Sequence, residues 1–283
     1  MGNSHPSDFS IWMRENLKSS WEGLIAQDID LVVFNENKFC IIEEKHKRYA
    51  RVGAAQAVVF KMLYEFLNLQ SKFKLTGIFL IHYLSDSEIY IKRFRIPTEE
   101  LTELFRTQDS DKLSQYHEEW WDRIVNYYLK NFWDCTGKPP ERGTRKERSF
   151  YRETKLSYIP NSKTIHWIFI NYCTGYFVIL EVQENGKGNF KPNENEKNLV
   201  SYLHNAFQEA QEVNSRNKKV RNPASQKPYE YLGYYLVEFS GTTPDNSETI
   251  WLNHEEVKKE ELKSMLKIPR KYVNILRSCG NET

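Results

Sequence analysis

The sequence predicts an α/β protein of the α+β type, with helices flanking a mixed central β-sheet and a second α+β domain following it. Runs of β-branched and aromatic residues alternate with segments of helical periodicity along most of the chain. The first two strand-like runs are apolar on both faces, which is typical of a sheet covered by helices on both sides. Hydrophobic residues make up 40% of the 283 residues, enough for a sizeable core.

A β-hairpin is predicted from the runs 28–34 and 39–45, which flank a polar turn containing two asparagines. Pairing outward from the turn sets Phe34 opposite Phe39. Side chains alternate between the two faces of a strand, so a single face collects every second residue of each run. That face carries Asp30, Val32, Phe34, Phe39, Ile41, Glu43 and Lys45.

The open end of this hairpin brings acidic residues together. Asp30 lies opposite Glu43, where paired side chains have Cβ atoms roughly 5 Å apart and like charges repel. A divalent cation such as Mg²⁺ relieves this repulsion, because it takes oxygen ligands and needs only one or two carboxylates besides water and phosphate. Lys45 follows on the same face, where its ammonium can stabilise charge on a phosphate or act on the attacking water.

The order of these features is a carboxylate, a hairpin, apolar residues and then the motif acid-x-Lys. In this order the first third of the chain resembles the PD-(D/E)xK nuclease superfamily. The resemblance implies a restriction-endonuclease-like core. It also implies that Asp30, Glu43 and the backbone of Glu44 bind the metal and that Lys45 acts on water and phosphate. Ile29 stands where the proline of the family name would be.

Further positions are assigned by the same resemblance. Gln56, on the helix after the Lys strand, matches a Gln that orients water or a metal ligand, although a Gln bonded to backbone is the alternative. Glu15 and Glu22 are candidates for an additional acid, or else solvated glutamates. Asp28 is the reserve ligand if the strand register slips by a pair. His82 is predicted to be a half-buried strand histidine without a role as a base.

The chain is expected to divide into a nuclease-like core (1–96), a helical extension (97–136), a basic linker (137–146) and a C-terminal α+β domain (147–283). No internal repeat is apparent in the sequence. A first helix is expected to begin at Ser7 or Asp8. The further strands are expected at 75–84, 89–94, 156–159, 164–171, 176–183, 231–240 and 248–252, and the later helices at 97–106, 113–133, 196–213 and 255–266.

Charge and composition limit the partners. Lys and Arg number 40 against 38 Asp and Glu, so the net charge of +2 gives no global basic field and any nucleic-acid surface is local. The basic segments 46–51, 137–146 and 215–227 are candidates for phosphate contacts, or else solvated surface. The four cysteines match neither a zinc site nor a disulfide framework. Without a signal peptide or an apolar run near 20 residues, a soluble, cytoplasmic protein without membrane contact is expected.

These observations favour a Mg²⁺-dependent nuclease, with Mn²⁺ as a possible substitute, that acts on double-stranded DNA as a restriction-type or repair-type endonuclease. Two rival hypotheses stay open: a catalytically inactive nuclease-like module that only binds nucleic acid, and an RNA-directed nuclease on the same scaffold. A structural or interaction protein is a weaker third. Cutting both strands would favour a homodimer, and the sequence does not determine specificity or the choice between endonuclease and exonuclease.

Overall fold

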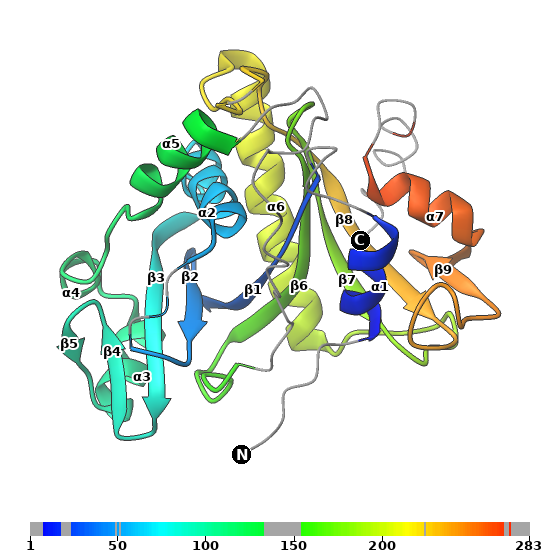
Figure 1. The fold of residues 1–283 in the computed structure, drawn as a ribbon. Helices are drawn as coiled ribbons and strands as arrows, with labels where there is room; N and C mark the ends of the chain where they lie inside the picture. Colours follow the sequence, from blue (N-terminus) through cyan, green and yellow to red (C-terminus); the bar gives the residue numbers. More distant parts are fainter. Residues whose placement is uncertain are drawn as a thin grey trace.

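The computed structural model describes residues 8–17, 24–48, 50, 52–132, 154–223, 225–268 and 272. Its centre is one continuous ten-stranded sheet with the strand order β10-β9-β8-β7-β6-β1-β2-β3-β4-β5 (Figure 1). The expected class, a mixed sheet flanked by helices, is confirmed. In the described residues, no helix is long and apolar enough to cross a membrane.

The elements follow one another in two successive sets. The first set consists of α1 (Asp8–Asn16), β1 (Leu24–Asn35), β2 (Lys38–Lys45), α2 (Ala54–Leu67), β3 (Lys74–Ser85), β4 (Glu88–Ile91), β5 (Phe94–Arg95), α3 (Thr98–Thr107), α4 (Ser110–Ser114) and α5 (Trp121–Phe132). The second set consists of β6 (Ser162–Asn171), β7 (Tyr176–Gln183), α6 (Glu194–Asn217), β8 (Glu230–Phe239), β9 (Ile250–Leu252), β10 (Glu255–Glu256) and α7 (Lys259–Leu266).

The predicted hairpin is present as β1 and β2, with the predicted register. Phe34 lies opposite Phe39, and the paired residues continue to Leu31 opposite Ile42. Its turn places Glu36 at φ 54°, a left-handed conformation of the kind that two-residue hairpin turns require. One further step along the hairpin would set Asp30 opposite Glu43, so the strands carry the acidic residues to its open end.

Both faces of the sheet are covered, as the doubly apolar strands predict. One face of the whole sheet packs against α2 and α6. The hairpin contributes Val32, Phe34, Phe39 and Ile41 to the hydrophobic core on this face. On the opposite face, α3 covers Leu31, Val33, Cys40 and Ile42. The opposite face of the second set packs against α1 and α7, which lie beside each other (Figure 1). Burial of these apolar side chains is the main force that holds the layers together.

The two sets of elements repeat the same arrangement. In each, an antiparallel hairpin leads into a helix on the shared face, then into a strand parallel to the second hairpin strand, and then into an antiparallel edge and a helix on the opposite face. We call β1 to α3 the first unit and β6 to α7 the second unit. Sequence inspection predicts no repeat, so this duplication appears only in the topology.

Local details of the two units also agree. A glycine with positive φ marks a register shift in the parallel strand of each unit: Gly77 in β3 (φ 151°) and Gly233 in β8 (φ 136°). An L side chain rarely adopts this conformation, and a Cβ at Gly77 would approach the Phe79 ring to 2.8 Å. Equivalent hydrogen bonds of 2.9 Å, from Ile96 to Ile89 and from Val257 to Ile250, close the edge strands before the last helix.

The units meet where β1 pairs antiparallel with β6, and the pairing is symmetric about the pair Ile29 and Ile165. Exchanging the two units turns the two pairs on one side of this centre into two of the pairs on the other side. This is the pattern of a two-fold contact, in which the same surface serves both partners. The matching pairs are Ala26 with Phe169 against Val33 with Ser162, and Gln27 with Ile168 against Val32 with Lys163.

Several expectations differ from the structure. The segment 89–94, expected as one strand, is divided between β4 and β5, and the segment 255–266, expected as one helix, contains β10 and then α7. The segment 113–133, expected as one helix, contains the short α4 and then α5, separated by residues 115–120. The segment 156–159, expected as a strand, is a turn whose Leu156 and Ile159 are buried beneath the first unit. The C-terminal α+β segment contributes strands to the same sheet as the core instead of building a separate one, because β6 pairs with the exposed edge of β1.

Candidate functional site

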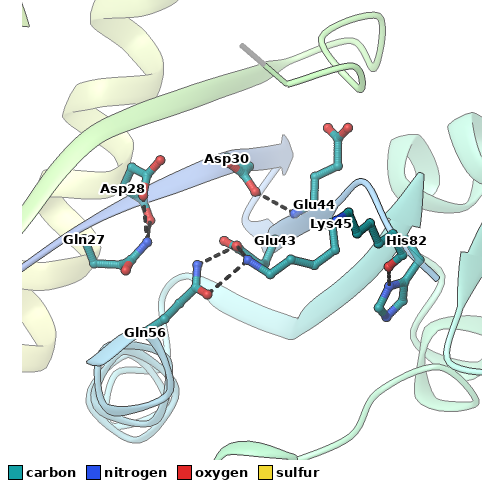
Figure 2. Close-up of polar contacts among 9 residues, drawn as sticks. Gln27, Asp28, Asp30, Glu43, Glu44, Lys45, Gln56 and His82 are labelled. Atoms are coloured by element: carbon teal, nitrogen blue, oxygen red, sulfur yellow. Dashed lines mark hydrogen bonds and ion pairs between the residues drawn. The ribbon is translucent and has the colours of Figure 1, made fainter. Parts of the chain in front are cut away.

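The predicted site residues gather where β2 ends and α2 begins. Glu43 and Lys45 are on β2, and Gln56 is in the first turn of α2 on the face that both units share. The Lys45 ammonium donates to Glu43 Oε1 and, at 3.1 Å, to Gln56 Oε1. The Gln56 amide in turn donates to Glu43 Oε1. Figure 2 shows these three side chains pointing toward one another, so the expected association of Gln56 with the acid-x-Lys pair is present.

Asp30 joins this group from the neighbouring strand. Its Oδ2 accepts a hydrogen bond of 2.6 Å from the backbone N–H of Glu44, which ties the carboxylate to β2 (Figure 2). The paired ladder of β1 and β2 stops one step earlier, at Leu31 and Ile42. The register shifts in β1 on either side of Ile29 therefore leave Asp30 free of the ladder and able to turn toward Glu43.

Burial and mutual repulsion raise the pKa values of the carboxyl groups in this group. Burial, followed by repulsion from Asp30, holds the pKa of Glu43 well above its usual range, although Lys45 opposes the shift. Burial also raises the pKa of Asp30, against the effects of the Glu44 N–H and Lys45. Burial and the nearby Asp30 raise the pKa of Asp28 to about 7. The ammonium of Lys45 is thus shared among three acidic side chains.

Asp28 is buried in β1 and lies within electrostatic reach of this group. Its Oδ1 accepts a hydrogen bond of 2.6 Å from the neighbouring Gln27 amide. Lys45 of β2 and His166 of β6 both lower its pKa by electrostatic attraction. No pattern in the sequence predicts that His166 lies near Asp28, because only the pairing of β1 with β6 brings the two residues together.

The Glu44 side chain does not take part in this group, since it points to the opposite face of the sheet (Figure 2). Its Oε2 accepts hydrogen bonds from the Thr154 hydroxyl at 2.6 Å and from the Lys155 N–H at 2.8 Å. Only the backbone of Glu44 was expected to serve a metal, and that expectation is compatible with this arrangement. No pattern in the sequence points to Thr154, which is 110 residues away along the chain.

The donor set suits a hard divalent cation. Glu43 Oε2 is buried and receives no hydrogen bond from the described residues, although Oε1 of the same carboxylate receives two. A buried anionic oxygen without a donor is costly unless something positive faces it. The described residues contain no cluster of three or more acidic, His or Cys side chains preformed as a metal cage. Mg²⁺ requires no such cage, since one or two carboxylates with water and substrate phosphate suffice.

The other candidates lie outside this group. His82 is more buried than expected, with 8% of its surface exposed, and its Nδ1 contacts the Lys47 carbonyl at 2.8 Å, which is a structural contact. Glu15 is exposed on α1, which packs on the face of the second unit opposite to Glu43. Glu22 lies outside the described residues.

Of the two other basic segments, only 215–227 lies mostly within the described residues. The linker 137–146 lies outside the described residues. In the segment 215–227, α6 continues to Asn217, and Arg221 donates to the carbonyls of Lys218 and Gln226 within the loop. A pocket of about 630 Å³ near this loop is lined by residues such as Gln211 and Tyr229, and by none of the predicted site residues.

Comparisons with known proteins identify relatives but no activity. No family model matches the sequence, and no solved structure matches it. An uncharacterized protein of Archaeoglobus fulgidus is 39% identical over 136 residues, which cover 44% of this chain and 86% of the relative. A second uncharacterized protein of the same organism is 37% identical over 135 residues, which cover 45% of this chain and 89% of the relative. The chain therefore belongs to the same family as these two archaeal proteins.

Proposed function

We propose that this protein is a divalent-cation-dependent nuclease that hydrolyses phosphodiester bonds, with Mg²⁺ as the cation, Mn²⁺ as a substitute and double-stranded DNA as the leading substrate. The observation that carries the proposal is the convergence of Asp30, Glu43, Lys45 and Gln56 at one end of β1, β2 and α2. The resemblance to PD-(D/E)xK nucleases supports it, because the same residue types stand at the matching positions.

Each residue has a defined role in this proposal. Asp30 and Glu43, with the Glu44 backbone carbonyl, would hold the cation. When bound, the cation would supply Lewis-acid activation of the phosphodiester and of water. Lys45 directs its ammonium toward the reacting phosphate and the attacking water, where a fixed positive charge stabilises the charge that develops in the transition state. Gln56 orients the Lys45 ammonium through its 3.1 Å contact and is a positioning residue.

The test incubates the wild-type protein with supercoiled plasmid and with structured RNA in Mg²⁺, Mn²⁺ or EDTA. Cleavage of DNA in the presence of the cation, absent in EDTA, supports the proposal. Lys45→Ala is expected to abolish cleavage, and Lys38→Ala, at the other end of the same strand, serves as the matched control. A Lys45→Ala variant that cuts at the wild-type rate refutes the assignment. Cleavage of RNA alone favours the RNA-directed alternative, and binding without cleavage favours the inactive module.

A further inference from the structure

The second unit contains a counterpart of the candidate site, and the strand registers identify its residues. Glu43 of β2 lies opposite Leu80 of β3, three residues after Gly77. Glu181 of β7 lies opposite Leu236 of β8, three residues after Gly233. Glu181 therefore stands at the position of Glu43.

The hairpins extend this correspondence to the other site residues. Leu31 pairs with Ile42 in the first unit, and Trp167 pairs with Leu180 in the second. The next step along each hairpin matches Asp30 with His166. Counting further along the same strands, Lys45 of β2 corresponds to Gln183 of β7, and Gln27 of β1 corresponds to Lys163 of β6. The second unit therefore keeps the buried glutamate but replaces the facing acid by an imidazole and the lysine by an amide.

Glu181 has basic side chains beside it and no neighbouring acid like the Asp30 of Glu43. His166 Nδ1 lies 2.9 Å from Glu181 Oε2, and Lys163 Nζ lies 3.5 Å from Oε1. Tyr234 also forms a side-chain hydrogen bond with this carboxylate. Burial raises the pKa of Glu181, but the two basic neighbours outweigh burial and leave it below its usual range. Two basic side chains thus lie beside Glu181, whereas Glu43 has one ammonium, that of Lys45, and a neighbouring acid, Asp30.

We propose that the chain is an asymmetric pseudo-dimer in which the first unit alone takes a divalent cation, while Lys163 and His166 fill the corresponding position of the second unit. The inference rests on the proposed function for its catalytic consequence, which is one strand cut per encounter with duplex DNA. The symmetric pairing of β1 with β6 provides the contact that two separate subunits would otherwise form.

The lengths of the relatives agree with this origin. One aligned segment makes up 44% of this chain and 86% of the first relative, so that relative is roughly half as long as this chain. The second relative has the same proportion. A chain of that length has room for one unit but not for both, because the first unit spans Leu24–Thr107 and the second spans Ser162–Leu266.

The test counts bound cations and does not depend on cleavage. Mn²⁺ is titrated into the full-length protein and bound metal is counted by calorimetry and by the loss of the free Mn²⁺ resonance signal. One ion per chain is expected for wild type, none for Glu43→Gln and one for the matched variant Glu181→Gln. Two ions per chain, or loss of the ion in Glu181→Gln, overturns the inference and leaves the proposed function standing. No ion in the wild type, together with no cleavage, refutes the proposed function itself.

A second arm follows the products from supercoiled plasmid. Nicked circles are expected to accumulate before any linear DNA, because one site cuts one strand in each encounter. Linear DNA that forms at the same rate as nicked circles shows paired cutting and overturns the pseudo-dimer with one site. The rebuilt variant Lys163→Gln/His166→Asp/Gln183→Lys restores the residues of the first unit, and a second bound Mn²⁺ is expected. A stably folded rebuilt variant that still binds one ion counts against the assigned correspondence.

Discussion

Replacing Glu43 by Gln is expected to stabilise the protein in the absence of metal while it abolishes cation binding. Glu43 is 3% exposed, and its Oε1 accepts from both Lys45 and Gln56. The amide oxygen introduced by Glu43→Gln accepts the same two hydrogen bonds. Its amide nitrogen takes the place of Oε2, which has no donor among the described residues, and can donate toward Asp30.

The magnitude follows from the groups involved. A hydrogen bond to a charged group contributes about 1.5–3 kcal/mol to stability, and a buried acceptor without a partner costs about 1–3 kcal/mol. The lost attraction between Lys45 and the carboxylate offsets part of this gain. A net stabilisation of about 1–2 kcal/mol remains, which for a chain of this length raises Tm by roughly 2–6 °C.

The assay is thermal unfolding at pH 8, first in EDTA and then in excess Mg²⁺. Wild type is expected to gain about 2.7 kcal/mol when Mg²⁺ is present at 100 times its Kd, whereas Glu43→Gln gains nothing. Glu181→Gln is the control with the opposite sign, because it removes the partner of Lys163 and His166 and costs about 3 kcal/mol. A Glu43→Gln variant that is less stable than wild type in EDTA and still responds to Mg²⁺ would refute the reasoning.

Three further predictions follow from the same contacts. Lys45→Ala should lower the rate of cleavage about 10²–10⁴-fold, because the ammonium acts on the reacting groups; circular dichroism checks that the variant, which leaves Glu43 without its ammonium, is folded, and a loss below tenfold contradicts this role. Glu44→Gln should keep cation binding, measured by Mn²⁺ titration, because its side chain bonds to Thr154 and Lys155 on the other face. The pKa of Glu181 is lowered in the folded protein, so its contribution to stability is full above its unfolded value near 4.5 and is lost as pH falls through the folded pKa. The deficit of Glu181→Gln in urea unfolding should therefore be largest at pH 6 and shrink below pH 4.5, and a deficit that does not change with pH contradicts the pairing.

The sequence by itself determined the local features of the site. The β-branched runs and the asparagine-containing turn predict the β1–β2 hairpin, and the predicted pairing of Phe34 with Phe39 is the observed one. Alternation along those strands also separates the two core faces correctly. These features are predictable because a tight turn fixes the register of a short hairpin, and the period of the strand fixes which side chains share a face.

Longer segments were less predictable, because tertiary contacts compete with local propensity. The apolar residues of 156–159 suggest a strand, but the structure uses Leu156 and Ile159 as buried anchors of a turn. The neighbouring Thr154 and Lys155 hold the Glu44 carboxylate across 110 residues of chain. No local pattern reports a partner at that distance in the sequence.

Only the tertiary structure decided how the two halves of the chain relate. No repeat is visible in the residues of the two units, but a β-sheet constrains strand order and register more tightly than it constrains side chains. The pairing about Ile29 and Ile165 therefore preserves the two-fold arrangement. The groups beside a buried glutamate depend on which strands lie next to it: Glu43 has Asp30 and Lys45 beside it, whereas Glu181 has Lys163 and His166.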